Sequence, residues 1–374
     1  MVTQGVTSPP FRADHVGSLL RPPAVRQARE DAAAGRITPA QLRAVEDDAI
    51  AAMVRMQEDV GLQAATDGEL RRGSWHMDFI YQLGGISRAE ENLVVQFQNT
   101  EGTIEFTPAA LRVDGTVRLE QPIFADAFRF LADTVTTAVP KLTIPSPSMV
   151  HYRGGRASID PALYPDLDQF WDDLSAAYAA EVKALAALGC RYLQLDDTSL
   201  AYLNDPHQRE MIASKGGDAE HQHERYIRQI NAALADRPEG MVVTTHCCRG
   251  NFRSSWVAEG GYDFVAEALF NGLAVDGFFL EYDDARSGGF EPLRFVPPGK
   301  RVVLGLVTTK RGALEDKDAL KRRIDEAARF VPLDQLCLSP QCGFASTLEG
   351  NDLSYAEQVA KLALVVETAA EVWG

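Results

Sequence analysis

The stretch VVTTHCC, residues 242–248, is a short apolar run that ends in ionisable side chains. The same pattern returns in GFFLEYD at residues 277–283 and in LCLSPQC at residues 336–342. Short, nearly continuous apolar runs are typical of strands that are buried on both faces of a parallel sheet. Further candidates lie on both sides of these three, and together they make eight: 13–17, 63–67, 142–146, 192–196, 242–246, 277–281, 302–306 and 336–339.

Helical patterns lie between the strand candidates. Thr38 to Gln41 reads as a capping box with proline at the first helical position, and that helix is expected to end near Gly61. A second apolar face runs from Phe170 to Leu185 and is closed by Gly189. Eight buried strands that alternate with helices predict an α/β fold, a single (β/α)8 TIM barrel over residues 1–374. A doubly wound open sheet would also explain the alternation, although it would not require the eighth strand.

The segment at about residues 87–122 departs from this rhythm. Its runs LVVQFQ, GTIEFT and TVRLEQ alternate apolar and polar residues around Gly102 and Gly115. Alternation of this kind predicts an antiparallel β-hairpin insertion after strand 2. The insertion is expected to serve as a cap over the barrel mouth or as a dimer contact, and the sequence does not choose between the two.

Composition narrows the class of protein. The 374 residues carry 53 acidic and 37 basic side chains, a net charge of −16, without a run of Lys or Arg, so we expect no nucleic-acid partner. Neither an apolar stretch of membrane-spanning length nor a leader pattern is found, which predicts a cytoplasmic protein without a membrane partner. The five cysteines are too sparse for a disulfide framework and favour metal binding or catalysis.

Four residues at three strand ends offer two thiolates, an imidazole and a carboxylate. His246 and Cys248 are spaced i, i+2, so on a strand both side chains leave the same face, whereas Cys247 points the other way. With Glu281 and Cys342 they make a set that closes one tetrahedral Zn²⁺ site. Structural zinc sites cluster their ligands in short loops, so ligands dispersed over strand ends favour catalytic zinc.

Several motifs resemble one family. THCCRGNF, FFLEYDDARSG and LSPQCGFAS, with DGELRRGSW and LQLDDTSLAY upstream, look like the catalytic barrel of cobalamin-independent methionine synthase and its short single-barrel relatives, over roughly residues 11–372. The resemblance implies that His246, Cys248, Glu281 and Cys342 are zinc ligands. It also implies that Asp196 and Glu69 contact the amino group of a thiol amino acid, and that Ser287 lies near the substrate carboxylate.

Two further residues are candidates for substrate contact. His15 closes the first strand candidate, where substrate binding and a hydrogen-bonded core histidine are the two readings. Tyr152 falls close to the position at which the family has an aromatic residue facing the pterin of the donor, and simple packing is its alternative.

The same resemblance has departures. Full-length methionine synthases carry a second, N-terminal barrel that helps to hold the folate donor, and the family places a histidine after the seventh strand where this chain has Leu306 to Lys310. The donor therefore stays open among folate, methylcobalamin and other methylated compounds. A homodimer, or a separate protein that supplies the donor, is a further possibility.

The predicted function is a zinc-dependent methyltransferase that activates a homocysteine-type thiol as the zinc thiolate. One alternative is zinc-dependent dealkylation of a methylated small molecule onto a thiol. Another is a metal-free decarboxylase or lyase similar to uroporphyrinogen decarboxylase, in which Asp196 and Asp197 would be the working acids. A third is a non-catalytic zinc-binding protein.

Overall fold

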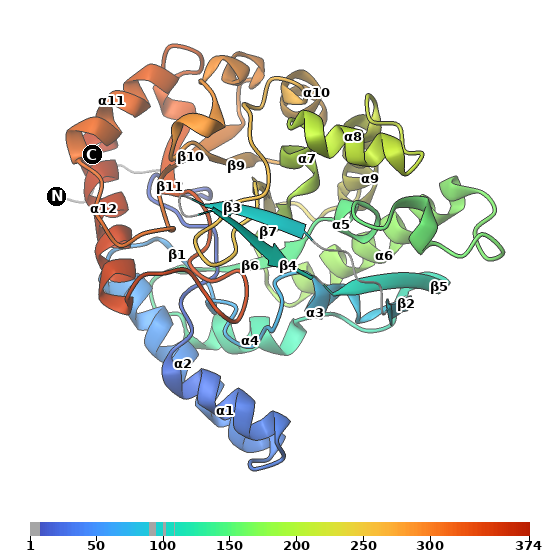
Figure 1. Ribbon diagram of the computed structural model, residues 1–374. Helices are drawn as coiled ribbons and strands as arrows, with labels where there is room; N and C mark the ends of the chain where they lie inside the picture. The colour runs from blue at the N-terminus through green and yellow to red at the C-terminus, as the bar shows by residue number, and fades with distance from the viewer. Residues whose placement is uncertain (1–7, 90–94, 100–101, 108) are drawn as a thin grey trace.

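The computed structural model describes residues 8–89, 95–99, 102–107 and 109–374. Its main sheet has seven strands in the order β1-β6-β7-β8-β9-β10-β11, and every neighbouring pair is parallel. The strands are β1 Ala64–Ala65, β6 Val139–Pro145, β7 Tyr192–Asp197, β8 Val242–Cys247, β9 Gly277–Glu281, β10 Arg301–Val307 and β11 Leu336–Pro340. Each strand lies beside its successor, without the order reversal of a doubly wound sheet. The chain has an α/β fold whose parallel sheet curls around a central axis (Figure 1).

Seven of the eight strand candidates form strands of this sheet. The first candidate, residues 13–17, forms only an isolated parallel bridge between Ala13 and Leu338 of β11. Its backbone hydrogen bonds are limited by local conformation, since Gly17 has φ +148° and the chain turns away after it. Further along, the Leu19 N–H donates to the Gly68 carbonyl at 3.0 Å, so this segment lies between the two edges of the sheet.

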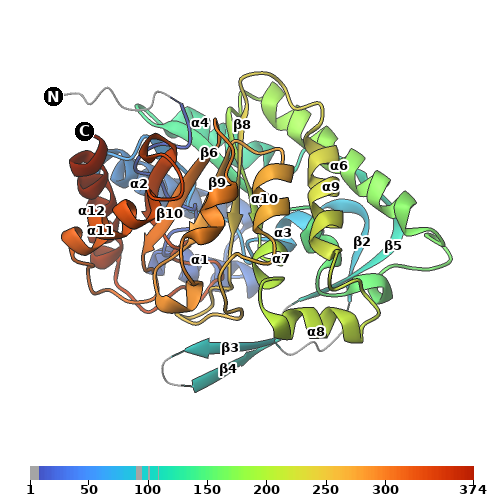
Figure 2. The ribbon, with the colours of Figure 1, turned by 90° about the horizontal axis from the view of Figure 1, so that it is seen from above.

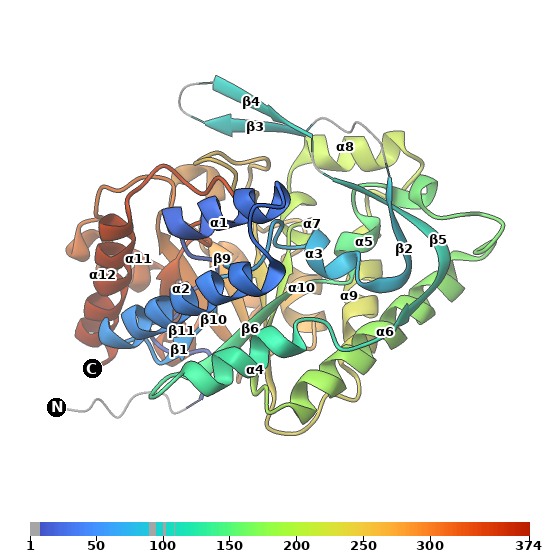
Figure 3. The ribbon, with the colours of Figure 1, turned by 90° about the horizontal axis from the view of Figure 1, so that it is seen from below.

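Helices cover the outside of the sheet, as Figures 1 and 3 show. The longer ones are α1 Pro23–Ala33, α2 Pro39–Asp59, α4 Ala125–Thr134, α6 Leu167–Ala187, α9 Gln222–Leu234, α11 Lys317–Ala327 and α12 Tyr355–Trp373. Shorter ones are α3 Met77–Ile80, α5 Ser148–His151, α7 Ser199–Tyr202, α8 Pro206–Ser214 and α10 Ala266–Gly272. The capping box expected at Thr38 is present, with the Gln41 N–H donating to Thr38 Oγ1 at 3.3 Å.

Strand burial explains the apolar runs. All residues of β7, β9 and β11 are buried, because helices cover one face of the sheet and side chains fill the other. Among the described residues, no helix is both long and apolar enough to cross a membrane.

Between β1 and β6 in the sequence, the chain forms two antiparallel strand pairs, whereas the sequence predicts one hairpin there. Strand β2, Leu83–Ala89, pairs with β5, Ala110–Leu119, and β3, Val95–Asn99, pairs with β4, Gly102–Phe106. The β2–β5 register shifts at Gly85, where φ is +82° and a Cβ would lie 2.5 Å from the Gly115 carbonyl oxygen. Figure 2 shows the β3–β4 pair projecting beyond the rest of the chain.

Candidate metal centre and active site

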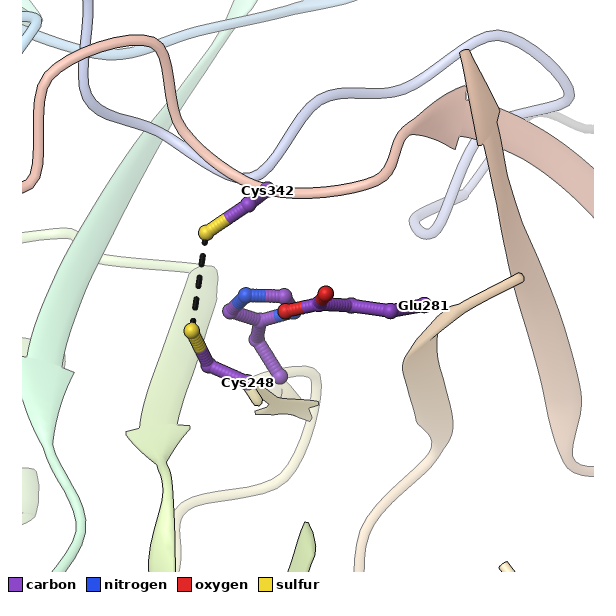
Figure 4. Close-up of side chains that lie close together, drawn as sticks. Cys248, Glu281 and Cys342 are labelled. Carbon is purple, nitrogen blue, oxygen red and sulfur yellow. Dashed lines mark hydrogen bonds between the residues drawn. The ribbon is translucent and has the colours of Figure 1, made fainter. Parts of the chain in front are cut away.

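Four side chains meet at the carboxyl ends of three strands. His246 belongs to β8 and Cys248 follows it, Glu281 ends β9, and Cys342 follows β11. One ligand atom from each lies within 4.8 Å of the others, and all four residues are buried. In Figure 4 the sulfurs of Cys248 and Cys342 point toward each other, and the carboxylate of Glu281 reaches in from a neighbouring strand. The predicted ligand set is therefore brought together.

Alternation along β8 separates the two adjacent cysteines. Cys247 packs in the hydrophobic core, whereas Cys248 lines a cavity. The chain then turns at Gly250, which has φ +92°. A Cβ there would lie 2.7 Å from Tyr202 Oη, so the turn that positions Cys248 requires glycine.

The two cysteines of the cluster, Cys248 and Cys342, form a contact, with Sγ atoms 3.6 Å apart. The contact with Cys248, together with His246, holds the pKa of Cys342 well below its usual range, and the contact with Cys342, together with burial, raises the pKa of Cys248. Burial, the largest single effect, lowers the pKa of His246, but the contact with Cys342 and the charges of Asp196 and Glu281 together outweigh it and raise that pKa to about 9. Without a metal ion, these pKa shifts favour a Cys342 thiolate beside a protonated His246, while Cys248 keeps its proton.

Several polar atoms of the cluster have no hydrogen-bond partner among the described residues. Both ring nitrogens of His246 and Oε2 of Glu281 are buried without a hydrogen bond, while Glu281 Oε1 accepts from the Arg249 N–H at 2.9 Å. Burial, and then the charge of Cys342, raises the pKa of Glu281 to about 7. Buried orphan donors and acceptors of this kind are expensive unless something else satisfies them.

The donor set fits a divalent metal ion. Bonds of about 2.0–2.3 Å to a tetrahedral ion put ligand atoms on the order of 3.5 Å apart, and the observed separations of up to 4.8 Å need only small side-chain shifts. Two sulfurs, one imidazole and one carboxylate oxygen form a ligand set typical of zinc, whereas Ca²⁺ and Mg²⁺ take oxygen ligands.

A cavity of about 210 Å³ opens beside the cluster. Glu69 and Asp196 line it together with His246, Cys248 and Cys342. Glu69 has φ +58°, a strained conformation for a residue other than glycine. Its Oε1 accepts from the Thr143 hydroxyl at 2.9 Å, and its Oε2 has no partner among the described side chains.

Burial raises the pKa values of both carboxyl groups. The pKa of Asp196 rises to about 7, because of burial and then the charge of Glu69, and the pKa of Glu69 is raised by burial against the opposing charge of Arg72. Two buried carboxyl groups in one cavity, one with a free oxygen, suit a cationic group of a ligand.

Three phenylalanine side chains also line the cavity. Phe97 of β3 and Phe106 of β4 line the cavity with Phe252, whose ring centre lies 5.3 Å from that of Phe97 and 4.5 Å from that of Phe106. Backbone hydrogen bonds between Gln98 and Trp256 fasten the strand pair to the rest of the chain. The projecting β3–β4 pair therefore contributes directly to the cavity.

Three of the predicted substrate contacts are not brought to this cavity. His15 is buried with neither ring nitrogen bonded among the described residues, and burial lowers its pKa to about 4. The Tyr152 hydroxyl donates to Gln208 Oε1 at 2.9 Å, and Tyr152 lines a different cavity of about 260 Å³. Ser287 is fully buried and its hydroxyl has no partner within the described part of the chain. The residues that line the 210 Å³ cavity do not include these three.

Sequence reasoning missed several lining residues, notably Arg153, Tyr202 and the phenylalanines. Arg153 lies in the segment after β6, and Tyr202 lies in the segment after β7. Segments that follow the strands of a barrel commonly contribute to its active site, so this position could have predicted both residues. Lys310, which stands near the position of the family's histidine, lies 2.5 Å from Asp283 and is held in an ion pair.

The sequence of the chain matches one family. A family profile described as "Cobalamin-independent synthase, Catalytic domain" matches residues 11–371. The chain belongs to this family.

Individual relatives are similar along most of their length. "Uncharacterized protein YxjH" of Bacillus subtilis is 48% identical over 365 residues, which are 97% of this chain and 95% of that protein. A crystal structure described as a putative vitamin-B12 independent methionine synthase from Listeria monocytogenes has a TM-score of 0.77 and 39% identity, and the match covers 98% of both chains. "Methionine synthase" of Pyrococcus abyssi is 23% identical over 83% of this chain and 79% of its own.

Proposed function

We propose that this chain is a zinc-dependent S-methyltransferase that transfers a methyl group to a homocysteine-type thiol, and that residues 1–374 form a single (β/α)8 barrel. The observation that carries the proposal is the meeting of His246, Cys248, Glu281 and Cys342 within 4.8 Å, beside a cavity lined by two carboxyl groups. Family membership supports the reaction class.

The four residues would hold Zn²⁺ through two sulfurs, one ring nitrogen and one carboxylate oxygen. When bound, the ion supplies Lewis acidity that keeps a substrate sulfur deprotonated near neutral pH. In the protein, the Arg249 N–H fixes one oxygen of Glu281, and Arg286 Nη2 lies 3.9 Å from the other. These contacts orient the carboxylate before any ligand arrives.

Glu69 and Asp196 would hold the ammonium group of the thiol amino acid. Thr143 fixes one oxygen of Glu69 and leaves the other free, and the Gln194 side chain donates to Asp196 at 2.6 Å. In the transfer, the sulfur forms a bond to the methyl carbon, and the bond from that carbon to the donor atom breaks, with its electron pair staying on the leaving group. The proton that the thiol releases balances the proton that a neutral donor's leaving group takes up.

The experiment is metal analysis and a methyl-transfer assay on Cys248→Ser and Cys342→Ser, with Cys247→Ala as the matched control. The serine variants should lose stoichiometric zinc and turnover, because a neutral hydroxyl replaces a thiolate ligand, while their circular dichroism stays like that of the parent. Cys247→Ala should keep zinc and activity, since Cys247 packs in the core. Full activity in either serine variant would refute the proposal.

Dealkylation of a methylated small molecule onto a thiol is the second candidate. The ion pair between Lys310 and Asp283 favours this candidate. Because the Lys310 ammonium group is held by Asp283, it is poorly placed to protonate the leaving group of a donor such as a methylated folate. Assays with homocysteine fixed and the donor varied among methyltetrahydrofolate, methylcobalamin and S-methyl or O-methyl compounds separate the two.

The metal-free decarboxylase or lyase is the weaker alternative. It would need Asp197 as a working acid, yet this carboxylate accepts hydrogen bonds from the Ser148 and Ser199 hydroxyls and from the Leu200 N–H. Such a carboxylate is a structural anchor for the helix that follows β7. An apo-enzyme with full activity would favour the alternative.

A further inference from the structure

We propose that Arg153 is the anion-binding residue of the 210 Å³ cavity and that it holds a carboxylate group of a substrate. The identity of the substrates rests on the proposed function, whereas the anion site rests on the structure of the cavity. Arg153 lies two residues after α5, in the loop that follows β6, and it lines the cavity with Glu69, Asp196 and Cys248.

One nitrogen of the guanidinium group of the half-buried Arg153 has no hydrogen-bond partner among the described residues. This nitrogen, Nη1, is buried, and no ion pair of Arg153 occurs in the described part of the chain. Two other buried arginines, Arg21 and Arg72, do have hydrogen-bond partners. Arg21 donates to four backbone carbonyls, and Arg72 donates to the hydroxyl and the carbonyl of Thr143. A buried cationic donor without a partner is costly, so a ligand that satisfies it gains that free energy.

The cavity pairs this cation with two carboxyl groups. Glu69 keeps one oxygen without a partner among the described atoms, and Asp196 lines the same space. An amino acid presents both an ammonium and a carboxylate group, and this combination of charges matches it. The guanidinium fork binds a carboxylate through two parallel hydrogen bonds, which fixes orientation as well as charge.

Ser287, the residue that the resemblance assigns to the substrate carboxylate, does not line the cavity. Arg153 is the one arginine or lysine among the described residues that line the cavity, whereas Arg72 donates to Thr143 and lies 3.7 Å from Glu69. The carboxylate that Arg153 binds belongs either to the thiol amino acid or to the methyl donor. Both present the same chemistry to the guanidinium, and the experiment below separates them.

The experiment compares the parent protein with Arg153→Gln and Arg153→Lys. Arg228→Gln, which changes an exposed arginine of α9 whose side chain is 59% exposed, is the control. Each zinc-loaded protein is titrated calorimetrically with homocysteine and with 3-aminopropane-1-thiol, which lacks only the carboxylate. Zinc content and thermal unfolding are measured first, so that a misfolded variant is recognised.

Arg153→Gln should weaken homocysteine binding by about 10- to 100-fold, the effect of losing one charge-assisted pair, and should change binding of the aminothiol by less than about twofold. Arg153→Lys should restore part of the loss. If homocysteine binding is unchanged but the KM of methyltetrahydrofolate rises, and the KM of a methylated tetrahydropterin without the glutamate carboxylates does not, the anion belongs to the donor. Either pattern supports the proposal.

The proposal is overturned if Arg153→Gln changes neither homocysteine binding nor the KM of the carboxylate-bearing donor, or if it weakens both thiols equally. Failure of the proposed function gives a different result. In that case the parent protein transfers no methyl group from any donor, while the calorimetric comparison of the two thiols still reports on Arg153.

Discussion

At the scale of single residues, the candidate site depends on backbone conformations that most side chains avoid. Glu69 lines the cavity with φ +58°, and Gly250 follows Cys248 with φ +92°. Left-handed conformations of this kind cost about 1–3 kcal/mol for residues other than glycine and persist where the surrounding structure imposes them. At Glu69 the conformation holds a carboxylate in the cavity, and at Gly250 it turns the chain two residues after Cys248.

Gly250→Ala separates backbone strain from steric crowding. The added Cβ would lie 2.7 Å from Tyr202 Oη and 2.9 Å from Val257 Cγ2. We expect the free energy of unfolding to fall by about 1–3 kcal/mol more than in the control, and zinc retention to weaken because Cys248 shifts. Gly240→Ala is the control, since Gly240 has φ +79° but open space around its Cβ position. Urea denaturation checks this, and equal losses in the two variants would contradict it.

At the scale of elements, helix α6 carries a buried carboxyl side chain. Glu181 of α6 has no exposed surface, and its two oxygens accept from the Ile123 N–H at 3.0 Å each. Burial raises the pKa of Glu181 to about 8, against the opposing effect of the Ile123 hydrogen bond. The helix therefore contains a carboxyl group that is neutral in the folded chain across much of the usual pH range.

Glu181→Gln tests this through the pH dependence of stability. Because the pKa is higher in the folded state than in the unfolded state, the stabilisation is present in acid and is lost as pH rises through about 8. Relative to the Gln variant, the parent should therefore lose on the order of 3 kcal/mol between about pH 5 and about pH 8.5. Urea unfolding of both proteins at the two pH values measures the difference, and other titrating groups cancel because both share them. A difference that does not change with pH would rule this out.

The sequence predicts elements well where burial dictates the pattern. Strands β6 to β11 were predicted because helices and interior side chains cover both faces, which demands continuous apolar residues. The segment 13–17 makes only one bridge, since its few residues include Asp14 and His15 and it turns at Gly17. The two antiparallel pairs were predicted as one hairpin because alternation indicates a strand but does not specify its partner.

The candidate site was predictable to the extent that its residues end predicted strands. The i, i+2 spacing of His246 and Cys248 and the positions of Glu281 and Cys342 at strand ends predicted the four residues that meet in the cluster. Arg153 and Phe97 were not predicted as site residues, since they reach the cavity from loops and from the β3–β4 pair. Such contacts join segments far apart in the chain, and local periodicity carries no information about them.

At the scale of the whole molecule, residues 12–19 join the first and last edges of the sheet. The Leu338 N–H donates to the Arg12 carbonyl at 2.8 Å, and the Asp14 N–H donates to the Leu338 carbonyl at 3.0 Å. The side chain of Arg12 also donates to the Leu336 carbonyl. A single bridge provides fewer backbone hydrogen bonds than a paired strand. Side-chain contacts must therefore help to hold this segment against the sheet.

The ion pair of Lys141 with Asp14 is one such contact. Lys141 Nζ lies 3.2 Å from Asp14 Oδ1, both side chains have no exposed surface, and Nζ also donates to the His15 carbonyl at 2.5 Å. The pair connects β6 to residues that meet β11, on the inner side of the sheet. Lys141→Met would leave the Asp14 carboxylate buried without a cation, although the Tyr192 hydroxyl still donates to it at 2.8 Å.

Lys141→Met should therefore lower the free energy of unfolding by about 3–5 kcal/mol. In the double variant Asp14→Asn/Lys141→Met, the loss should be smaller than the sum of the single losses by about 1–3 kcal/mol, because the second change removes the charge left unpaired by the first. Lys183→Met is the control, since its pair with Asp236 has side chains 53% and 75% exposed and contributes little. Urea denaturation of the parent, the single variants and the double variant gives the free energies of unfolding for this double-mutant cycle. If Lys141→Met lost no more than Lys183→Met, or if the single losses simply added, the pair would not be what holds the first segment against the sheet.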